Sequence, residues 1–209
     1  MKKWILFFWL ASPASVLFAQ TADDFYQSAS EKLQDGDTTG AITDCNQAIA
    51  MKPNYSDAYN GRGVLKFLSG DFMGALAAYN QAIVLSAQDA KLYYNRGIVY
   101  AKLNQWEAAL ADYTKAIELK LDYAEAYFSR GIIKGDMGDM KGEIQDYTIA
   151  IQLKENYADA YFNRALANFD LDNNEAAIED YNKAAALKRG VPVLAKGFPR
   201  ASLTLTIDN

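Results

Sequence analysis

Residues 90–123 read AKLYYNRGIVYAKLNQWEAALADYTKAIELKLDY, and this stretch decides the fold. Apolar side chains recur every three or four residues in its first half and again from Trp106 onward, with the polar pair Asn104 and Gln105 between the two runs. That spacing predicts two amphipathic helices joined by a turn, each with one apolar side.

The same pattern recurs every 34 residues along most of the chain. The string LYYNRG at Leu92 has counterparts at Ala58, Ala126 and Ala160. Five units therefore follow one another without a gap, at residues 22–55, 56–89, 90–123, 124–157 and 158–191. One helix pair cannot bury its apolar side alone, so neighbouring units must stack.

These units resemble the tetratricopeptide repeat, a 34-residue helix–turn–helix motif. The family has aromatic residues at positions 4 and 24 of the unit and small residues at positions 8, 20 and 27. Unit three matches with Tyr93, Gly97, Ala109, Tyr113 and Ala116, and the other units follow with few departures, among them Glu143 at position 20 and Cys45 at position 24. The resemblance implies an all-α fold, a right-handed α-solenoid of five tandem repeats.

The composition argues against an enzyme. The 209 residues carry a net charge of −5, and an acidic chain does not attract the phosphate backbone of nucleic acids. The chain has no histidine, the commonest general base, and Cys45 has no second cysteine with which to pair. We therefore expect no catalytic residue, metal, cofactor or nucleic-acid partner, and we expect Cys45 to be a buried, inert thiol.

The first 19 residues are typical of a secretory signal peptide. Lys2 and Lys3 precede the apolar run WILFFWL at residues 4–10, and Ala19 is a small residue suited to cleavage. The apolar stretch is shorter than a membrane-spanning helix requires. These features predict a periplasmic or secreted protein that begins at Gln20 and has no stable membrane insertion. An uncleaved anchor is the alternative.

The C-terminal segment, residues 192–209, falls outside the repeat. Pro192, Gly197 and Pro199 disfavour a helix, and SLTLTI at residues 202–207 alternates like a strand without a partner. Three roles stay open for this irregular tail: it covers the last helix, pairs with another molecule, or is disordered.

Two charged series follow the repeat. Arginine occupies position 7 as Arg62, Arg96, Arg130 and Arg164, and aspartate occupies position 23 as Asp44, Asp112, Asp146 and Asp180. We expect these charges to pair near the helix-packing surfaces. Each aspartate could meet the arginine of its own unit or of the next one. We favour the next unit, because unit one has Ser28 in place of arginine and no unit precedes it.

In tetratricopeptide superhelices the first helix of each pair lines an inner, concave groove. The resemblance extends this role to positions 5, 6 and 9 of the present units, which are largely aromatic, polar and aliphatic. The predicted ligand-binding residues are Tyr26, Asn60, Tyr94, Asn95, Ile98, Phe128, Ile132, Phe162, Asn163 and Leu166. The alternative is that the position-9 side chains merely pack between helices and that the groove holds no ligand.

Acidic residues flank this predicted groove at positions 2 and 13. They are Asp57, Glu125, Asp136, Asp159 and Asp170. An apolar floor with acidic edges favours a protein or peptide segment that has apolar anchors and basic flanks. We therefore expect a non-enzymatic scaffold for protein–protein interaction. The alternative from a different class is a module that binds a glycan or another cell-envelope polymer through the same aromatic residues.

Overall fold

The computed structural model describes residues 20–188, and within them the chain forms ten α-helices and no strand. They follow one another as five pairs: α1 (Ala22–Gln34) with α2 (Thr38–Met51), α3 (Ser56–Leu68) with α4 (Phe72–Leu85), α5 (Ala90–Lys102) with α6 (Trp106–Leu119), α7 (Ala124–Asp136) with α8 (Met140–Leu153), and α9 (Ala158–Asp170) with α10 (Asn174–Leu187). The predicted signal peptide, residues 1–19, and the tail, residues 192–209, lie outside the described residues.

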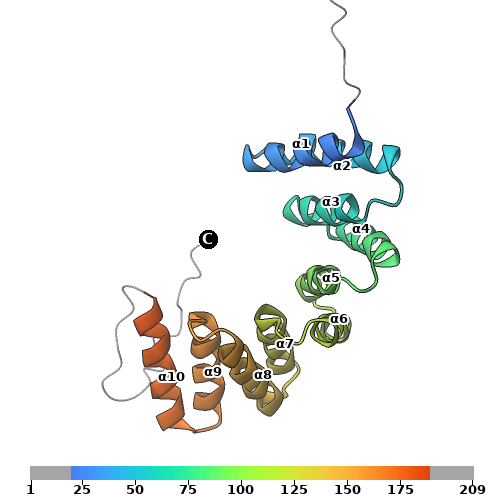
Figure 1. Ribbon diagram of the computed structural model, residues 1–209. Coiled ribbons are helices and arrows are strands. Elements are labelled where there is room, and N and C mark those ends of the chain that lie inside the picture. Colours follow the sequence, from blue (N-terminus) through green and yellow to red (C-terminus); the bar gives the residue numbers. More distant parts are fainter. Residues whose placement is uncertain (1–19, 189–209) are drawn as a thin grey trace, which may run out of the picture.

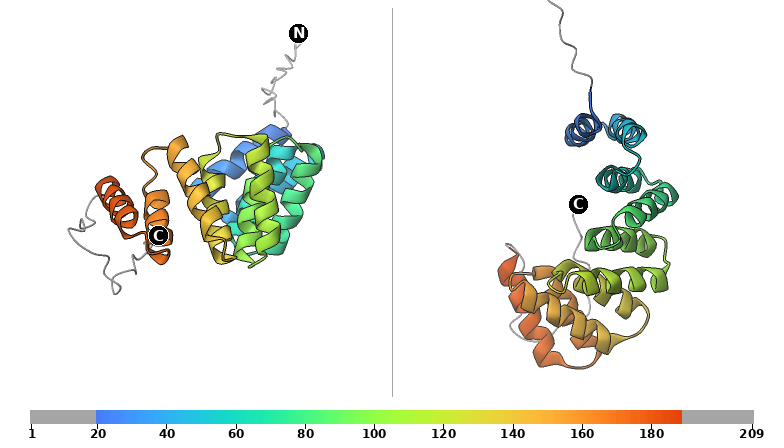
Figure 2. Two further views of the ribbon diagram at one scale, coloured as in Figure 1. Left: turned by 90° about the horizontal axis from the view of Figure 1, so that it is seen from below. Right: turned by 45° about the vertical axis from the view of Figure 1, so that its right-hand side comes forward.

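The pairs stack along a curve (Figure 1). Each first helix packs against the second helix of its own pair, and that second helix packs against the first helix of the next pair. In addition, α3 contacts α5 and α5 contacts α7, so the first helices line the inner side of the curve. The right view of Figure 2 shows the same curve from another direction. The expected all-α solenoid is confirmed.

The turn within each unit requires a left-handed backbone at position 15. Glycine takes this conformation in three units, with φ between 81° and 85° at Gly36, Gly70 and Gly138. Asn104 and Asp172 adopt it in the other two, at 57° and 61°. Asparagine and aspartate tolerate positive φ better than other residues with a side chain, so all five turns keep one shape.

Three of the second helices have an aspartate as their N-cap residue. The carboxylates of Asp37, Asp71 and Asp139 accept hydrogen bonds from the backbone N–H three residues later, at 2.8–2.9 Å. The donor is a glycine each time. A Cβ atom at Gly142 would overlap with Oδ2 of Asp139, so a side chain there would displace the cap.

The helices of each pair approach closely where position 8 faces position 24. A Cβ atom at Gly97 would lie 2.7 Å from Cε1 of Tyr113, which is 2% exposed. Gly63 and Gly131 stand in the same relation to Tyr79 and Tyr147. The position-8 glycines therefore make room for a buried tyrosine ring. In unit one the smaller Cys45 faces Ala29 instead, and burial raises the pKa of its thiol to about 11.

Unit four accommodates Glu143 where the other units have alanine. Its carboxyl group lies against Gly135, where a Cβ atom would be 2.6 Å from Glu143 Cδ. The equivalent residue is larger in every other unit, for example Phe67 in unit two. Because the missing side chain of Gly135 provides the space, α7 packs against α8 as extensively as the helices of the other pairs do.

Candidate functional site

The position-5 rings on the first helices are held by stacked tyrosines. Tyr94 packs against Tyr113 and Tyr123, with ring centroids 5.8 and 4.9 Å apart. Phe128 repeats this one unit later with Tyr147 and Tyr157, at 5.6 and 4.9 Å. Each ring is therefore wedged between position 24 and position 34 of its own unit.

The two terminal units keep part of this arrangement. Tyr26 packs against Tyr55 with 5.4 Å between centroids, and burial raises the pKa of the Tyr26 hydroxyl. Phe162 lies 6.1 Å from Tyr181. All these position-5 rings are partly buried, so they contribute to packing between helices as well as to the inner surface.

The predicted aliphatic residues differ in exposure. Ile132 follows Phe128 by one helical turn and therefore lies on the same side of α7, where it is 37% exposed. Ile98 packs against the cluster of Ala109, Tyr113 and Ile133, and Leu166 is partly buried. Of these three residues, Ile132 offers the most surface to a ligand.

Two of the predicted asparagines bond to each other across neighbouring first helices. Asn95 Nδ2 donates to Asn60 Oδ1 over 3.1 Å, which joins α5 to α3 on the inner side. Asn163 Nδ2 donates to the carbonyl oxygen of Asp159 within its own helix, over 2.8 Å. Within residues 20–188, the side-chain oxygen of Asn95 accepts no hydrogen bond and the amide nitrogen of Asn60 donates none, so both are available to a ligand.

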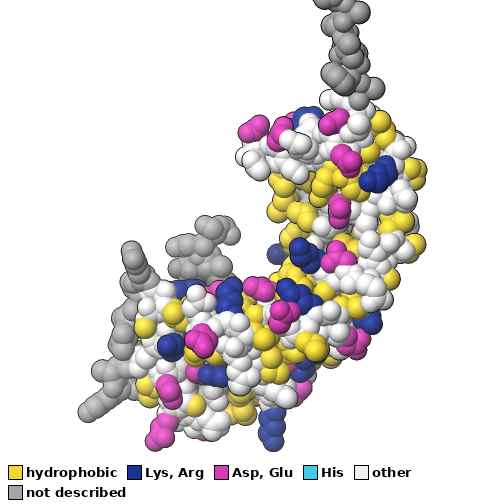
Figure 3. Space-filling model, in the orientation of Figure 1, with side chains coloured by type: hydrophobic (Ala, Val, Ile, Leu, Met, Phe, Trp, Pro, Cys, Tyr) yellow, Lys and Arg dark blue, Asp and Glu magenta, His cyan; other side chains and the backbone are white. Residues whose placement is uncertain are grey.

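The charges along the inner edges are more mixed than the sequence suggests. Glu125 forms an ion pair with Lys154 at 3.2 Å, and Asp159 forms one with Lys188. Unit three carries exposed lysines, Lys91 and Lys102, at the positions where units four and five carry acidic residues. Figure 3 shows side chains of both signs on the face that it displays. Among the five predicted acidic residues, Asp57, Asp136 and Asp170 form no ion pair within residues 20–188.

The arginine series pairs within each unit, and the preference for the next unit is wrong. Arg96 holds Asp112 with two hydrogen bonds of 2.8 and 2.7 Å. The same two-pronged contact joins Arg130 to Asp146 and Arg164 to Asp180, at 2.7–2.8 Å. The reason is that positions 7 and 23 face each other across the two antiparallel helices of one pair.

The arginines also reach back to the preceding unit. The remaining Nη1 of Arg96 donates to Asn80 over 2.7 Å, and that of Arg164 donates to Thr148 over 2.9 Å. Each guanidinium group therefore ties three helices together. Ser28 in unit one has a different explanation from the expected one: its hydroxyl donates to Asp44, which also pairs with Lys32 at 2.6 Å.

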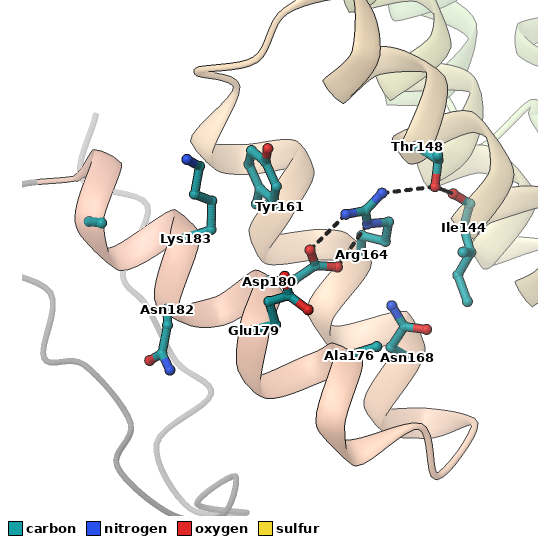
Figure 4. Close-up of a pocket in the computed structure, with 11 residues that line it drawn as sticks. Ile144, Thr148, Tyr161, Arg164, Asn168, Ala176, Glu179, Asp180, Asn182 and Lys183 are labelled. Carbon is teal, nitrogen blue, oxygen red and sulfur yellow. Dashed lines mark hydrogen bonds and ion pairs between the residues drawn. The ribbon is translucent and has the colours of Figure 1, made fainter.

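A pocket of about 690 Å³ lies beside the last of these ion pairs. Figure 4 shows that it is bounded by α8, α9 and α10, with the Arg164–Asp180 pair in its wall. Because two of these three are second helices, the pocket opens on the outer side of the solenoid. None of the predicted groove residues lines it.

The pocket was not predicted from the repeat pattern, although a single residue of the sequence accounts for it. Position 11 of the unit carries Asn168 here, whereas unit three has Tyr100 and unit four has Lys134. The short asparagine leaves open the space that a longer side chain fills elsewhere. All three guanidinium nitrogens of Arg164 already donate to Asp180 or Thr148, so the edge that matches a carboxylate is occupied in this pocket.

Comparison with known proteins agrees with this architecture. Three family models, all described as tetratricopeptide repeat, match residues 26–90, 69–128 and 158–190. The chain belongs to the tetratricopeptide repeat family. No curated protein sequence matches it significantly.

Several solved structures share the fold of this tetratricopeptide repeat protein. MamA is 25% identical with a TM-score of 0.71, over 76% of this chain and 93% of MamA. YrrB, described as having an unusual peptide-binding site, is 22% identical with a TM-score of 0.66, over 80% of this chain and 86% of YrrB. PilF of Pseudomonas aeruginosa is 18% identical with a TM-score of 0.75, over 80% of this chain and 77% of the PilF chain.

Two further properties concern residues 20–188 of this tetratricopeptide repeat protein. No helix in this range combines the length and apolar character needed to cross a membrane. No group of three or more aspartate, glutamate or cysteine side chains in the same range is arranged to hold a metal ion.

Proposed function

We propose that this tetratricopeptide repeat protein is a non-enzymatic scaffold that binds a peptide or protein segment along the inner side of the solenoid. The observation that carries the proposal is the row of position-5 rings. Tyr94, Phe128 and Phe162 recur one unit apart, and each is fixed by packing against neighbouring tyrosines. A row of fixed, partly exposed rings suits a partner with apolar anchors at regular spacing.

Preorganisation supports this role. Binding costs conformational entropy when side chains must be immobilised, and rings already wedged between two tyrosines avoid that cost. Ile132 adds exposed apolar surface one turn from Phe128. Beside the rings, the free oxygen of Asn95 and the free amide nitrogen of Asn60 can bond to the backbone of a bound segment. YrrB, a similarly folded protein with a peptide-binding site, provides an analogy at the level of the fold.

The charges specify the partner further. Asp136 and Asp170 lie at the C-terminal ends of α7 and α9, which favours basic residues of the partner there. Lys91 and Lys102 lie at opposite ends of α5, so that part of the solenoid favours acidic residues. We therefore infer a partner segment whose charge changes sign between unit three and units four and five.

Site-specific photo-crosslinking tests the proposed surface. A photo-crosslinking amino acid replaces Ile132 on the inner side or, as a matched control, Val84. Val84 is 77% exposed and occupies the position equivalent to Ala186, which lines the outer pocket. After illumination in native cell extract, position 132 should give a defined protein adduct that position 84 does not. Equal adducts at both positions, or adducts only with cell-wall polymer, would contradict the proposal.

We also propose that the protein is exported and begins at Gln20 in its mature form. The basic residues Lys2 and Lys3, the short apolar run after them and Ala19 support this. N-terminal sequencing of the protein from its native host should find Gln20 first, in the periplasmic or secreted fraction. An intact Met1 in the cytoplasmic fraction would contradict export.

A further inference from the structure

Three units of the solenoid show what a position-7 arginine binds. In each of them, Nε and Nη2 hold the two carboxylate oxygens of the position-23 aspartate at 2.7–2.8 Å. The remaining Nη1 bonds to position 25 of the preceding unit, and the guanidinium group lies near the ring of the position-4 tyrosine, for example 5.7 Å from Tyr93 in the case of Arg96. One guanidinium group therefore has three kinds of contact.

Unit two keeps two of these contacts and lacks the third. Arg62 donates from Nη1 to Asn46 over 3.0 Å and lies 5.0 Å from the Tyr59 ring centroid. Its position-23 neighbour is Ala78, which has no carboxylate. The aspartate at position 23 of the preceding unit, Asp44, is already engaged by Ser28 and Lys32. No carboxylate of residues 20–188 forms an ion pair with Arg62.

The unused side of Arg62 is accessible to solvent. Nε and Nη2 of Arg62 have no hydrogen-bond partner in the described part of the chain. No buried side-chain nitrogen in residues 20–188 lacks a partner, so these two atoms are not buried. Because the Asn46 and Tyr59 contacts hold the guanidinium group as in the other units, its two-pronged edge is positioned to receive a carboxylate from outside.

The surface beside Arg62 does not repel such a group. The pocket in unit five is lined by Glu179 and Lys183, and the equivalent residues in unit two are Ala77 and Gln81. Both are exposed and neutral. The nearby Lys66 is paired with Asp71 at 2.7 Å, so Arg62 supplies the unpaired positive charge of this surface.

We propose that Arg62 is an anchoring site for an acidic side chain, Asp or Glu, of a protein partner on the outer side of the solenoid. The partner carboxylate bonds to Nε and Nη2 of Arg62, the two atoms that hold the position-23 aspartate in the arginines of units three, four and five. The planar guanidinium group matches a carboxylate with two parallel hydrogen bonds, which lysine cannot provide. This surface is separate from the inner face, so the proposal does not depend on the proposed function.

Arginine side-chain NMR of the full chain tests this site directly. The probe is N-acetyl-aspartate N-methylamide, and the matched neutral probe is N-acetyl-asparagine N-methylamide. The Arg62 Nε–Hε resonance, assigned by its loss in Arg62→Lys, should shift and saturate with the aspartate probe alone. The resonances of Arg96, Arg130 and Arg164 should stay in place, because their carboxylate position is filled.

The variant Ala78→Asp provides the internal control. It should move the Arg62 resonance close to those of the other three arginines without any probe, and it should weaken the response to the aspartate probe at least about tenfold. An equal response to both probes, an equal response to inorganic phosphate, or an undiminished response in Ala78→Asp would overturn the proposal. The comparison of probes on the unmodified chain decides the question even if the variant does not fold.

Discussion

At the scale of single residues, Asp146 holds together the most deeply buried ion pairs of the solenoid within residues 20–188. Its side chain is 1% exposed and pairs with Arg130 at 2.8 Å and with Lys134 at 2.9 Å. The ion pair Lys115–Glu118, by contrast, is exposed at both ends. The two sites allow a buried and an exposed ion pair to be compared in one molecule.

Replacing Asp146 by Ala should cost about 3 kcal/mol, because two poorly solvated cations lose their shared partner. Glu118→Ala should cost at most about 0.5 kcal/mol, because water screens that pair. Urea unfolding of both variants, followed by circular dichroism, measures the difference. A loss below about 1 kcal/mol for Asp146→Ala would mean that the two cations find solvent when the aspartate is removed.

Glu143 makes the stability of unit four depend on pH. Burial raises the pKa of its carboxyl group, and the neighbouring charges of Asp136, Asp170 and Asp139 raise it further, against the hydrogen bond from Tyr147. The folded chain therefore binds this proton more readily than the unfolded chain does. The stabilisation is complete below the ordinary glutamate pKa and is lost as the pH rises through the higher pKa of the folded state.

Glu143→Gln should therefore melt at a higher temperature than the unmodified chain at about pH 7. The gain should shrink as the pH falls toward about 4, where the native glutamate is itself protonated. Melting curves of both proteins across this range measure the effect. A gain that is constant over the range, or largest at low pH, would contradict the assigned burial of the carboxyl group.

At the scale of helix pairs, helix propensity and close packing have opposite effects on a substitution at Gly131. Alanine favours a helix over glycine by about 1 kcal/mol. A Cβ atom at this position would lie 2.7 Å from the Tyr147 ring, which is 1% exposed and therefore surrounded by other side chains. Ala165 is tolerated at the same position of α9 because its partner Tyr181 is only partly buried.

Gly131→Ala should consequently destabilise the protein by about 1–2 kcal/mol despite its better helix propensity. The unfolding midpoint in urea measures the net effect. An unchanged or higher midpoint would show that the Tyr147 ring shifts to accept the methyl group, and that close packing does not exclude a side chain at this position.

The helix pairs could be predicted from the sequence because their signals are local and repeated. Five copies of one pattern specify the helices, the turn residues such as Gly36 and Asn104, and the small residues that face Tyr113 and its equivalents. The partner of Arg130 could not be predicted in this way, because Asp146 of its own unit and Asp112 of the preceding unit lie at similar separations along the chain. Only the packing of the two helices of one unit against each other shows which of the two aspartates is the partner.

Less of the candidate site than of the helix pairs could be predicted from the sequence. The wedging of Phe128 between Tyr147 and Tyr157 depends on how two positions far apart in the unit converge. The space that Gly135 leaves for Glu143 and the pocket beside Asn168 arise from single departures from the repeat. A repeat pattern predicts what the units share, and such departures become meaningful only when their neighbours are known.

At the scale of the whole molecule, the curve of the solenoid divides the surface into an inner and an outer side. First helices contact one another on the inner side, as the Asn60–Asn95 hydrogen bond shows. The pocket beside the Arg164–Asp180 pair (Figure 4) is lined mostly by residues of the second helices α8 and α10, which lie on the outer side of the curve (Figure 1). The proposed peptide surface and the proposed acidic-side-chain anchor at Arg62 therefore occupy opposite sides, and one molecule could hold two partners at once.

Ile132 tests the inner side more cleanly than the rings do. Phe128→Ala would remove ring contacts with Tyr147 and Tyr157 and lower stability as well as affinity. Ile132 is 37% exposed, so its loss should affect folding little. Val84, exposed on the outer side, gives a matched apolar control.

The most direct test of the inner binding surface is calorimetric titration with the partner that crosslinking at position 132 identifies. The titration compares Ile132→Ser and Val84→Ser with the unmodified chain. We predict that Ile132→Ser weakens binding about tenfold through lost apolar contact, while Val84→Ser binds like the unmodified chain. Both variants should keep the native melting temperature. Unchanged binding by Ile132→Ser, or an equal loss in both variants, would contradict a partner surface on the inner side of the solenoid.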